Sequence, residues 1–479
     1  MNMKTSRISA ALAQHCPEFD FQPFGTLLQP MIREIVSAGG LDNVRKGTIL
    51  TPFVTIWLVL VLTMRRDLNC RKALNWMMSG LRWLQGCLPV AANLVSEGAV
   101  THARVKIGVD VFRQLFSAMR TRFAPIRADF YERVTAVFDG TTGTTPDTKS
   151  NNACWGKPGA RQGTAAFPQV RIMSLLVLSV REIWDVAYAP YRGKQTGERA
   201  LMLTILDRLG GLVFLLLLDA GLYSFQMLRT LRQGGHDFMI KAPNTFTLPV
   251  LKRLPDGSFL TQITGKIEDL SKPVTATGRR HWKTETLMVR AISVQIAGYR
   301  PFFLLTSLVD PTIPARDIIR HYHARWDIEM AYDELKTHQC ATLRGQSPTT
   351  FRSKRADLVE QELYAMVIMY NAIRHLMAEA ATEHGVDPRT LSFLEAFHLM
   401  IDAAPILTAQ SEGRQAVGRV HLLANIADAT IDRPRRHRIN SRVVKVKSSK
   451  FARKKASDCS QQLNVEDDVK ILEYQEEKA

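Results

Sequence analysis

The sequence lacks any apolar run long enough to cross a membrane. Its most apolar stretch, residues 53–64, is only 12 residues long and is followed directly by Arg65 and Arg66, whereas a membrane-spanning helix needs roughly 20. The N-terminus also lacks a long apolar segment followed by a small-residue cleavage site, so we expect no signal peptide. These absences argue against a membrane protein and against an exported one.

Closely spaced cysteine pairs are missing as well. The six cysteines are scattered at positions 16, 70, 87, 154, 340 and 459, and no two form a CxxC pair. This spacing favours reduced thiols and a cytoplasmic location over a disulfide framework or a structural zinc site. The sequence also contains no GxxxxGK[ST] loop, so we expect no dependence on ATP.

Acidic residues are few relative to basic ones. The 63 Lys and Arg exceed the 45 Asp and Glu, which gives a net charge of +18. Such an excess predicts a polyanionic partner, either nucleic acid or an anionic membrane surface. The basic residues are densest at 433–455, where 11 Lys or Arg occur without an acid; the last 24 residues hold seven acids and two Lys. The basic block could be a polyanion-binding tail or simply a solvated segment.

The length of 479 residues suggests about three domains. We predict a helical, DNA-binding N-terminal domain over residues 1–125, and an α/β domain over 130–382 with a β insertion at about 243–300. A C-terminal helical region with the basic and then acidic tail would occupy residues 383–479.

One amphipathic segment, residues 105–123, illustrates the predicted N-terminal domain. Its apolar stripe predicts a helix packed in a bundle. Lys106, Arg113 and Arg120 lie beside the stripe. They could follow a phosphate backbone, but the pattern favours a solvated, ion-paired face.

Two acids follow predicted strands in the α/β region. Residues 133–139 form a short β-rich run that ends at Asp139, and the continuous apolar run 212–218 is followed by Asp219. An uninterrupted apolar run is typical of a strand buried on both faces. Ligands usually bind at the carboxyl ends of such strands. Each acid alone could equally be a turn residue, and the sequence does not reveal whether the two strands are neighbours.

A third group lies on a helix predicted to begin near Ala315. At 100° per residue, Tyr322, Arg325, Glu329 and Lys336 share a sector of about 60°. One acid flanked by cations and a phenol could bind a metal and a phosphodiester, or could be an ion-paired solvated face. Asp333 lies on the same face, so spacing alone does not select Glu329.

These residues carry a family resemblance. Tyr322, Arg325, Glu329 and Lys336 match the Y-x2-R-x3-E-x6-K signature of DDE transposases of the insertion-sequence-four family. The resemblance extends over most of the chain through DGTTGTTPDTKSNN, LDAGLYSFQMLRTL and LRGQSPTTFRSKRADLVEQELYAMVIMYNAIR. One modest departure is Leu222, where relatives often carry an aromatic residue.

The resemblance implies a ribonuclease-H-like catalytic domain, interrupted by a β insertion between the second Asp and the Glu. It implies a metal-binding triad of Asp139, Asp219 and Glu329. Carboxylates suit two Mg²⁺ ions, for which Mn²⁺ could substitute. Asp139 would bridge both ions, and the other two acids would each complete one site.

The same resemblance implies that Tyr322, Arg325 and Lys336 position DNA phosphates. Trp326, at the edge of their sector, could stack on a displaced base or pack the helix against the sheet. The expected reaction is cleavage of double-stranded DNA at the element ends, then attack of the freed 3′-hydroxyl on target DNA. Some relatives form a DNA hairpin. We also expect a homodimer in the DNA complex and association with the bacterial nucleoid.

Two other functions remain open at this point: a ribonuclease-H-like nuclease without strand transfer, and an inactive DNA-binding descendant of a transposase. Other polar clusters predict no site. His321 and His323 are two residues apart on a helix and cannot converge on one metal. Glu362 borders an apolar stripe, and we expect it to pair with an Arg or Lys rather than to act as a fourth metal-site acid.

Overall fold

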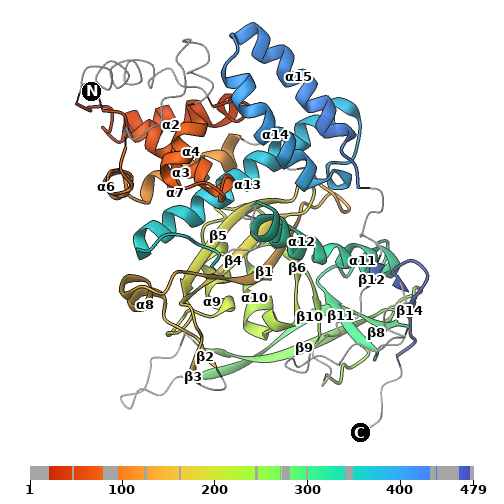
Figure 1. The fold of residues 1–479 in the computed structure, drawn as a ribbon. Helices are drawn as coiled ribbons and strands as arrows, with labels where there is room; N and C mark the ends of the chain where they lie inside the picture. The colour runs from red at the N-terminus through yellow and green to blue at the C-terminus, as the bar shows by residue number, and fades with distance from the viewer. Residues whose placement is uncertain are drawn as a thin grey trace, which may run out of the picture.

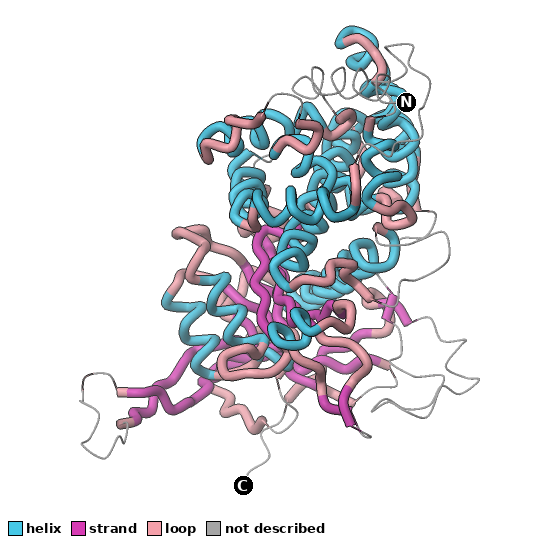
Figure 2. Tube along the Cα trace, turned by 60° about the vertical axis from the view of Figure 1, so that its left-hand side comes forward, coloured by secondary structure: helices cyan, strands magenta, loops and turns pink. Residues whose placement is uncertain are grey.

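The computed structural model describes residues 21–45, 48–78, 95–122, 127–160, 163–242, 246–269, 271, 281–297, 300–339, 349–431, 438–439 and 463–474. Most helices gather in one half of the molecule, and the long sheet forms the other half (Figures 1 and 2). Apolar side chains from the N-terminal helices, from one face of the sheet and from the C-terminal helices form a continuous core. A second apolar core lies on the opposite face of the sheet.

The N-terminal part is helical, as predicted. Its described helices are α2 (Gly25–Ala38), α3 (Pro52–Met64), α4 (Cys70–Met77), α6 (Glu97–Ile107) and α7 (Asp110–Arg122). Every residue of α3 is buried. Its buried threonine hydroxyls are satisfied by main-chain oxygens; Thr63 Oγ1, for example, donates to Leu60 O at 2.7 Å. Among the helices that the structure describes, none combines the length and apolarity needed to cross a membrane.

The segment 105–123 is not the single helix that its apolar stripe predicts. Gly108 adopts a φ of +70° and ends α6, a conformation that favours glycine. On α7, Arg113 pairs with Glu360 and Arg120 with Asp185, each at 2.9 Å. These contacts agree with an ion-paired face rather than with free cations along a phosphate backbone.

The centre of the sheet follows the order β5-β4-β1-β6-β7. The strands are β1 (Thr135–Thr144), β4 (Gln169–Val177), β5 (Glu182–Pro190), β6 (Leu215–Leu218) and β7 (Asp237–Lys241). β5, β4 and β1 pair antiparallel, whereas β1, β6 and β7 run parallel. All four residues of β6 are buried, as its unbroken apolar run predicts. This arrangement confirms a ribonuclease-H-like α/β fold.

The predicted insertion extends this sheet. Strands β8 (Lys252–Arg253), β9 (Phe259–Glu268) and β10 (Trp282–Ile296) continue the order beyond β11 (Phe302–Thr306), which pairs antiparallel with β7. β11 therefore returns the chain to the main sheet after the insertion. Helices α9 (Glu198–Leu206) and α10 (Phe225–Gln233) pack against the sheet, and α8 (Lys149–Trp155) follows β1 in the chain.

The helix expected after residue 315 departs from α-helical geometry in two places. It comprises α11 (Ala315–His323), the 3₁₀ turn η3 (Ala324–Trp326), α12 (Asp327–Asp333) and the π turn η4 (Glu334–His338). A regular 100° spacing therefore describes this run only approximately. The π turn directs Glu334 toward Arg374 of α13 (Ala356–His384) and Lys336 toward Thr141 of β1.

The first described residues pack against the C-terminal helices in the helical half. The remaining helices are α14 (Phe393–Thr408) and α15 (Glu412–Asp428), both near α13 (Figure 1). Gln22 N donates to Thr408 Oγ1 at 3.2 Å, and Arg419 Nη1 donates to Pro23 O at 3.3 Å. Residues just before α2 are thus bound to the last two long helices.

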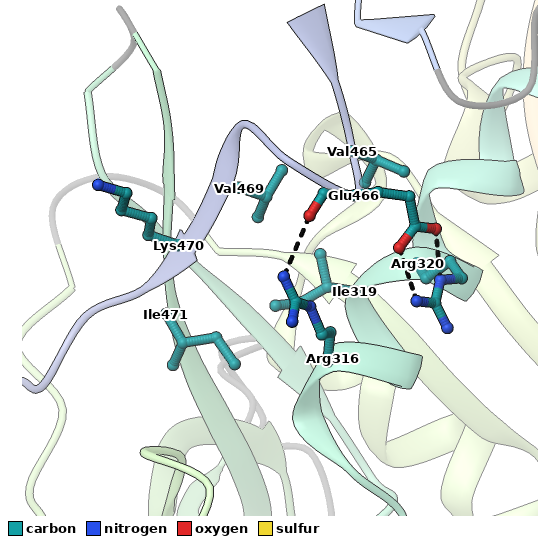
Figure 3. Close-up of a pocket in the computed structure, with 8 residues that line it drawn as sticks. All are labelled: Arg316, Ile319, Arg320, Val465, Glu466, Val469, Lys470 and Ile471. Atoms are coloured by element: carbon teal, nitrogen blue, oxygen red, sulfur yellow. Dashed lines mark hydrogen bonds and ion pairs between the residues drawn. The ribbon is translucent and has the colours of Figure 1, made fainter.

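The acidic C-terminal segment is part of the sheet. Its strand β14 (Val469–Ile471) pairs antiparallel with β10, while β13 (Leu463–Asn464) precedes a turn that carries Glu466. The Glu466 carboxylate accepts two hydrogen bonds of 2.6 Å from Arg320, and its main-chain oxygen accepts one from Arg316 (Figure 3). This segment therefore neutralises part of α11. The basic block at 433–455 lies outside the described residues, except for 438–439.

Candidate active site

The first two acids lie side by side on neighbouring strands. Asp139 is in β1, and Asp219 follows β6 directly. The strands are parallel, with Phe138 opposite Leu218, so each acid comes one residue after a paired position. The sequence could not show that the two strands are neighbours. Their adjacency argues against the alternative that the two acids are unrelated turn residues.

Glu329 comes from α12, which packs against β1. Arg325 joins it to Asp219: the guanidinium Nη2 lies 3.8 Å from Asp219 Oδ1 and 3.9 Å from Glu329 Oε1. Only 5% of Arg325 is exposed. The structure thus gathers two of the acids around one buried cation.

Asp139 belongs to the same charged group. Burial raises the pKa of its carboxyl to about 6, and the negative charges of Glu329 and Asp219 act in the same direction. The nearby Arg325 charge and a hydrogen bond from Gly140 N, at 2.9 Å, oppose this rise in the pKa. All three acids therefore influence one another at the end of the β1–β6 pair.

The phenol of Tyr322 is turned toward a strand end. Its hydroxyl donates to Leu218 O at 2.9 Å, immediately before Asp219. Burial raises the pKa of Tyr322 to about 12, so the phenol stays protonated and can donate this bond. In this state Tyr322 fixes the end of β6.

The Lys336 side chain is bound to β1, whereas the Trp326 side chain is exposed. Lys336 Nζ donates to Thr141 Oγ1 and, at 2.8 Å, to Thr142 O, just beyond Asp139 in β1. Trp326 is 37% exposed, and its ring centroid lies 5.2 Å from Arg325 Cζ. Such exposure does not fit a tryptophan buried between helix and sheet.

Sequence reasoning missed Tyr332. Its hydroxyl donates to Asp139 O at 2.7 Å, and the residue is 9% exposed. At regular helical spacing it falls about 60° from Glu329, just beyond the sector of the signature residues. Its position on the helix, close to the face of the signature residues, is the one sequence feature that points to Tyr332. The bond itself cannot be predicted from sequence, because every residue has a main-chain oxygen.

Three other polar residues that the sequence brought into question, Asp333, His321 and Glu362, contact residues other than the three acids. Asp333 is exposed and lies 3.6 Å from His338. His321 stacks on Phe130 and lies 2.7 Å from Thr135 Oγ1. Glu362 accepts hydrogen bonds from the main-chain amides of residues 352 and 353. The Ser353 hydroxyl also donates to Glu362, and the Glu362 charge acts on the buried guanidinium of Arg104.

Comparison with known proteins agrees with this geometry. The family described as "Transposase DDE domain" matches residues 131–372, and "Insertion element 4 transposase N-terminal" matches residues 24–117. The chain belongs to the DDE transposase family. This transposase is 25% identical over 437 residues to the transposase InsG for insertion sequence element IS4 of Escherichia coli (strain K12), covering 89% of this chain and 92% of the relative.

Among solved structures, the transposase is similar to a piggyBac transposase synaptic complex with hairpin DNA. The sequence identity is 10% and the TM-score 0.42, with 90% of this chain and 89% of that chain covered.

DDE transposases use divalent metal ions, and the residues of this site suit them in kind. Carboxylate oxygens are the preferred ligands of hard divalent cations. As the side chains stand, the described residues contain no ready-made group of three metal ligands. The position between Asp219 and Glu329 is nevertheless one that stabilises positive charge, since the Arg325 guanidinium occupies it. The three acids therefore fit a divalent cation provided that Arg325 moves aside.

Proposed function

We propose that this transposase cleaves double-stranded DNA at the ends of its insertion sequence and joins the freed 3′-hydroxyl to target DNA. The observation that carries the proposal is that Asp219 and Glu329 flank Arg325, while Asp139 on the neighbouring parallel strand is under the charge of all three residues. Two acids from a sheet and one from a helix are the type of ligand that metal-dependent phosphodiester chemistry needs.

The proposed cofactor is Mg²⁺, bound as two ions by Asp139, Asp219 and Glu329, with Mn²⁺ as a substitute. We propose that Asp139 would contribute to both ion sites, because the negative charges of Glu329 and Asp219 both act on its carboxyl group. When bound, such ions activate the attacking oxygen and stabilise the leaving oxygen.

The chain's own side chains would position the DNA. Lys336 holds the strand that carries Asp139, and its ammonium lies at the edge of the site. We propose that Lys336, Arg325 and Tyr322 contact phosphates beside the cleaved bond, with Arg325 released from the acids when metal and DNA bind. The exposed ring of Trp326 is placed to stack on an unpaired base.

The remaining assignments concern the whole protein. We propose that residues 1–125 bind DNA, that residues 130–382 carry the chemistry, and that residues 383–479 form a C-terminal helical region followed by a basic and then an acidic segment. The active complex is proposed to be a homodimer on DNA at the nucleoid. These proposals rest on the family and on the net charge of +18.

The test uses the full-length protein with DNA that carries the element's own ends and a supercoiled target. Wild type with Mg²⁺ should release the element end and join it to the target. Glu329→Gln should abolish both steps while retaining DNA binding. Asp333→Asn is the matched control, because Asp333 lies one turn away on the same helix but is exposed, and it should remain active.

The alternative functions predict different products. Cleavage without joined product would support a nuclease without strand transfer. DNA binding without cleavage, unchanged by Asp139→Asn, would support an inactive descendant. Loss of activity in Asp333→Asn but not in Glu329→Gln would overturn the assignment of the third acid.

A further inference from the structure

We propose that Tyr332 is a positioning residue for the active site: its hydroxyl holds the main chain of Asp139 at the distance from α12 that lets Asp139 and Glu329 act on the same metal ion. This inference rests on the function proposed above and extends it to a residue outside the signature. Tyr332 lies three residues after Glu329 on α12, so both side chains leave the helix toward the sheet.

The contact is short, buried and made to the acid's own residue. Tyr332 Oη donates to Asp139 O at 2.7 Å. The main-chain oxygen of Asp139 lies just past the last β1–β6 pair, Phe138 and Leu218, where β1, among the described strands, continues paired with β4 alone. On the β6 side of β1, the bond from Tyr332 therefore links the Asp139 main chain directly to α12. A shift there would carry the Asp139 carboxylate with it.

Tyr322 makes the equivalent bond to the second strand. Its hydroxyl donates to Leu218 O, the residue before Asp219, at 2.9 Å. Tyr322 and Tyr332 thus bind carbonyl groups on both acid-bearing strands where the β1–β6 pairing ends, with Glu329 between them in the chain. Together they set the positions of Asp139 and Asp219 relative to Glu329.

Two further features suit Tyr332 to this role. Ser174, which is 1% exposed, lies opposite Asp139 in β4 and is a polar neighbour of the phenol. The ring also supports Lys336, whose Nζ lies 5.6 Å from the ring centroid. Tyr332 therefore contacts two functional groups at once.

The experiment compares Tyr332→Phe with Tyr370→Phe in the full-length protein. Tyr370 is a matched control, because it is fully buried and its hydroxyl also donates to a main-chain oxygen, that of Arg181, at 3.0 Å. We expect both variants to lose similar thermal stability in EDTA. Titration with Mn²⁺, followed by electron paramagnetic resonance, should show roughly tenfold weaker binding in Tyr332→Phe only.

Metal-free binding to element-end DNA gives the second measurement. It should be unchanged in Tyr332→Phe, because the defect lies in the arrangement of acids and not in DNA contacts. Ser174→Ala offers an independent perturbation of the same phenol, and it should weaken Mn²⁺ binding by roughly twofold to threefold, in the same direction.

Equal Mn²⁺ affinities in Tyr332→Phe, Tyr370→Phe and wild type would overturn the inference. So would a Tyr332→Phe variant that fails to fold together with a Ser174→Ala variant that binds Mn²⁺ like wild type. The proposed function is tested separately by the wild type: if it neither binds Mn²⁺ nor cleaves DNA, that function fails whatever the tyrosine variants do.

Discussion

At the scale of single residues, Arg325 holds the active site together. Its guanidinium lies between Asp219 and Glu329 while being almost completely buried. Two carboxylates brought together without a cation would repel each other. Arg325 therefore offsets the repulsion between Asp219 and Glu329.

This position leads to a prediction for Arg325→Met. In EDTA the variant should unfold at a lower temperature than wild type, because the repulsion between the acids is no longer relieved. Added Mg²⁺ should raise its melting temperature by more than it raises that of wild type, since the ion then meets no competing guanidinium. Differential scanning fluorimetry across a Mg²⁺ series measures both effects.

The control is Arg229→Met, which breaks an ion pair with Glu285 away from the acids. It should leave the Mg²⁺-induced rise in melting temperature at the wild-type value. An equal rise in Arg325→Met and wild type would contradict the competing role of Arg325.

His321 supplies a prediction about pH. Burial and the nearby Arg389 charge lower its pKa from 6.5 to about 4, so the folded protein resists a proton that the unfolded chain accepts. The stability associated with neutral His321 is present above pH 6.5 and is lost as the pH falls toward 4. Between pH 7.5 and 5 the loss should be about 2 kcal/mol.

The measurement is urea unfolding of wild type and His321→Gln at several pH values. The variant cannot take up this proton, so the stability difference between the proteins should shift in its favour as the pH falls. A difference independent of pH would show that His321 does not titrate as its burial requires.

At the scale of elements, buried ion pairs fix α12 and η4, which carry Glu329 and Lys336, to the rest of the fold. Asp327 accepts from Arg181 Nε at 3.0 Å, and Glu334 pairs with Arg374 of α13. Arg181 and Arg374 are each 2% exposed. α12 and η4 thus present Glu329 and Lys336 to the sheet while their opposite side is fixed to the helical half.

Arg374→Met should therefore destabilise the protein by about 3–5 kcal/mol, because it leaves the Glu334 carboxylate buried without its main cation. Glu334→Gln together with Arg374→Met should recover part of that loss, since no uncompensated charge remains. Chemical denaturation of the single and double variants measures this recovery. If the two losses simply add, the two residues do not act as a pair.

Several elements could be predicted from sequence because their signals are local. The buried β6 follows from an unbroken apolar run, and α3 from a segment without charge. The 3₁₀ and π turns around α12 were not predictable from the regular helical spacing; the π turn carries Glu334 and Lys336, whose partners lie far away in the sequence. Gly108 did carry a local signal for a break, but the apolar stripe around it outweighed that signal.

The candidate site was predictable in its residue types and order, but not in its contacts. Asp139, Asp219 and Glu329 were selected by resemblance, and only the strand register shows that the first two are neighbours. The bonds of Tyr322 and Tyr332 end on main-chain oxygens. Such acceptors exist at every residue, so no sequence pattern can point to the particular ones used.

At the scale of the whole molecule, positive charge dominates, and it is distributed unevenly. The densest block, residues 433–455, contains 11 Lys or Arg, whereas Glu466 beyond it binds Arg316 and Arg320. The acidic C-terminal segment thus has partners within the fold, which leaves its negative charge less able to offset the basic block.

We therefore predict that DNA binding depends steeply on salt. If about 10 phosphates are neutralised, the logarithm of the binding constant should fall against the logarithm of salt concentration with a slope near −9, and this slope should become shallower when the 11 basic residues of 433–455 are replaced by Gln. Fluorescence anisotropy over a salt series gives both slopes. The replacement keeps the chain length, so an unchanged slope would exclude this block as a DNA contact.

The bonds from Gln22 to Thr408 and from Arg419 to Pro23 span 386 and 396 residues of chain. At a synthesis rate of about 5–20 residues per second, the segment before α2 emerges tens of seconds before Thr408 and Arg419 have been synthesised. β10 likewise precedes its partner β14 in the chain. These surfaces of the helical half and the sheet can therefore close only after residues 408–419 and 469–471 have been made, and a product that stops before them would leave both surfaces uncovered.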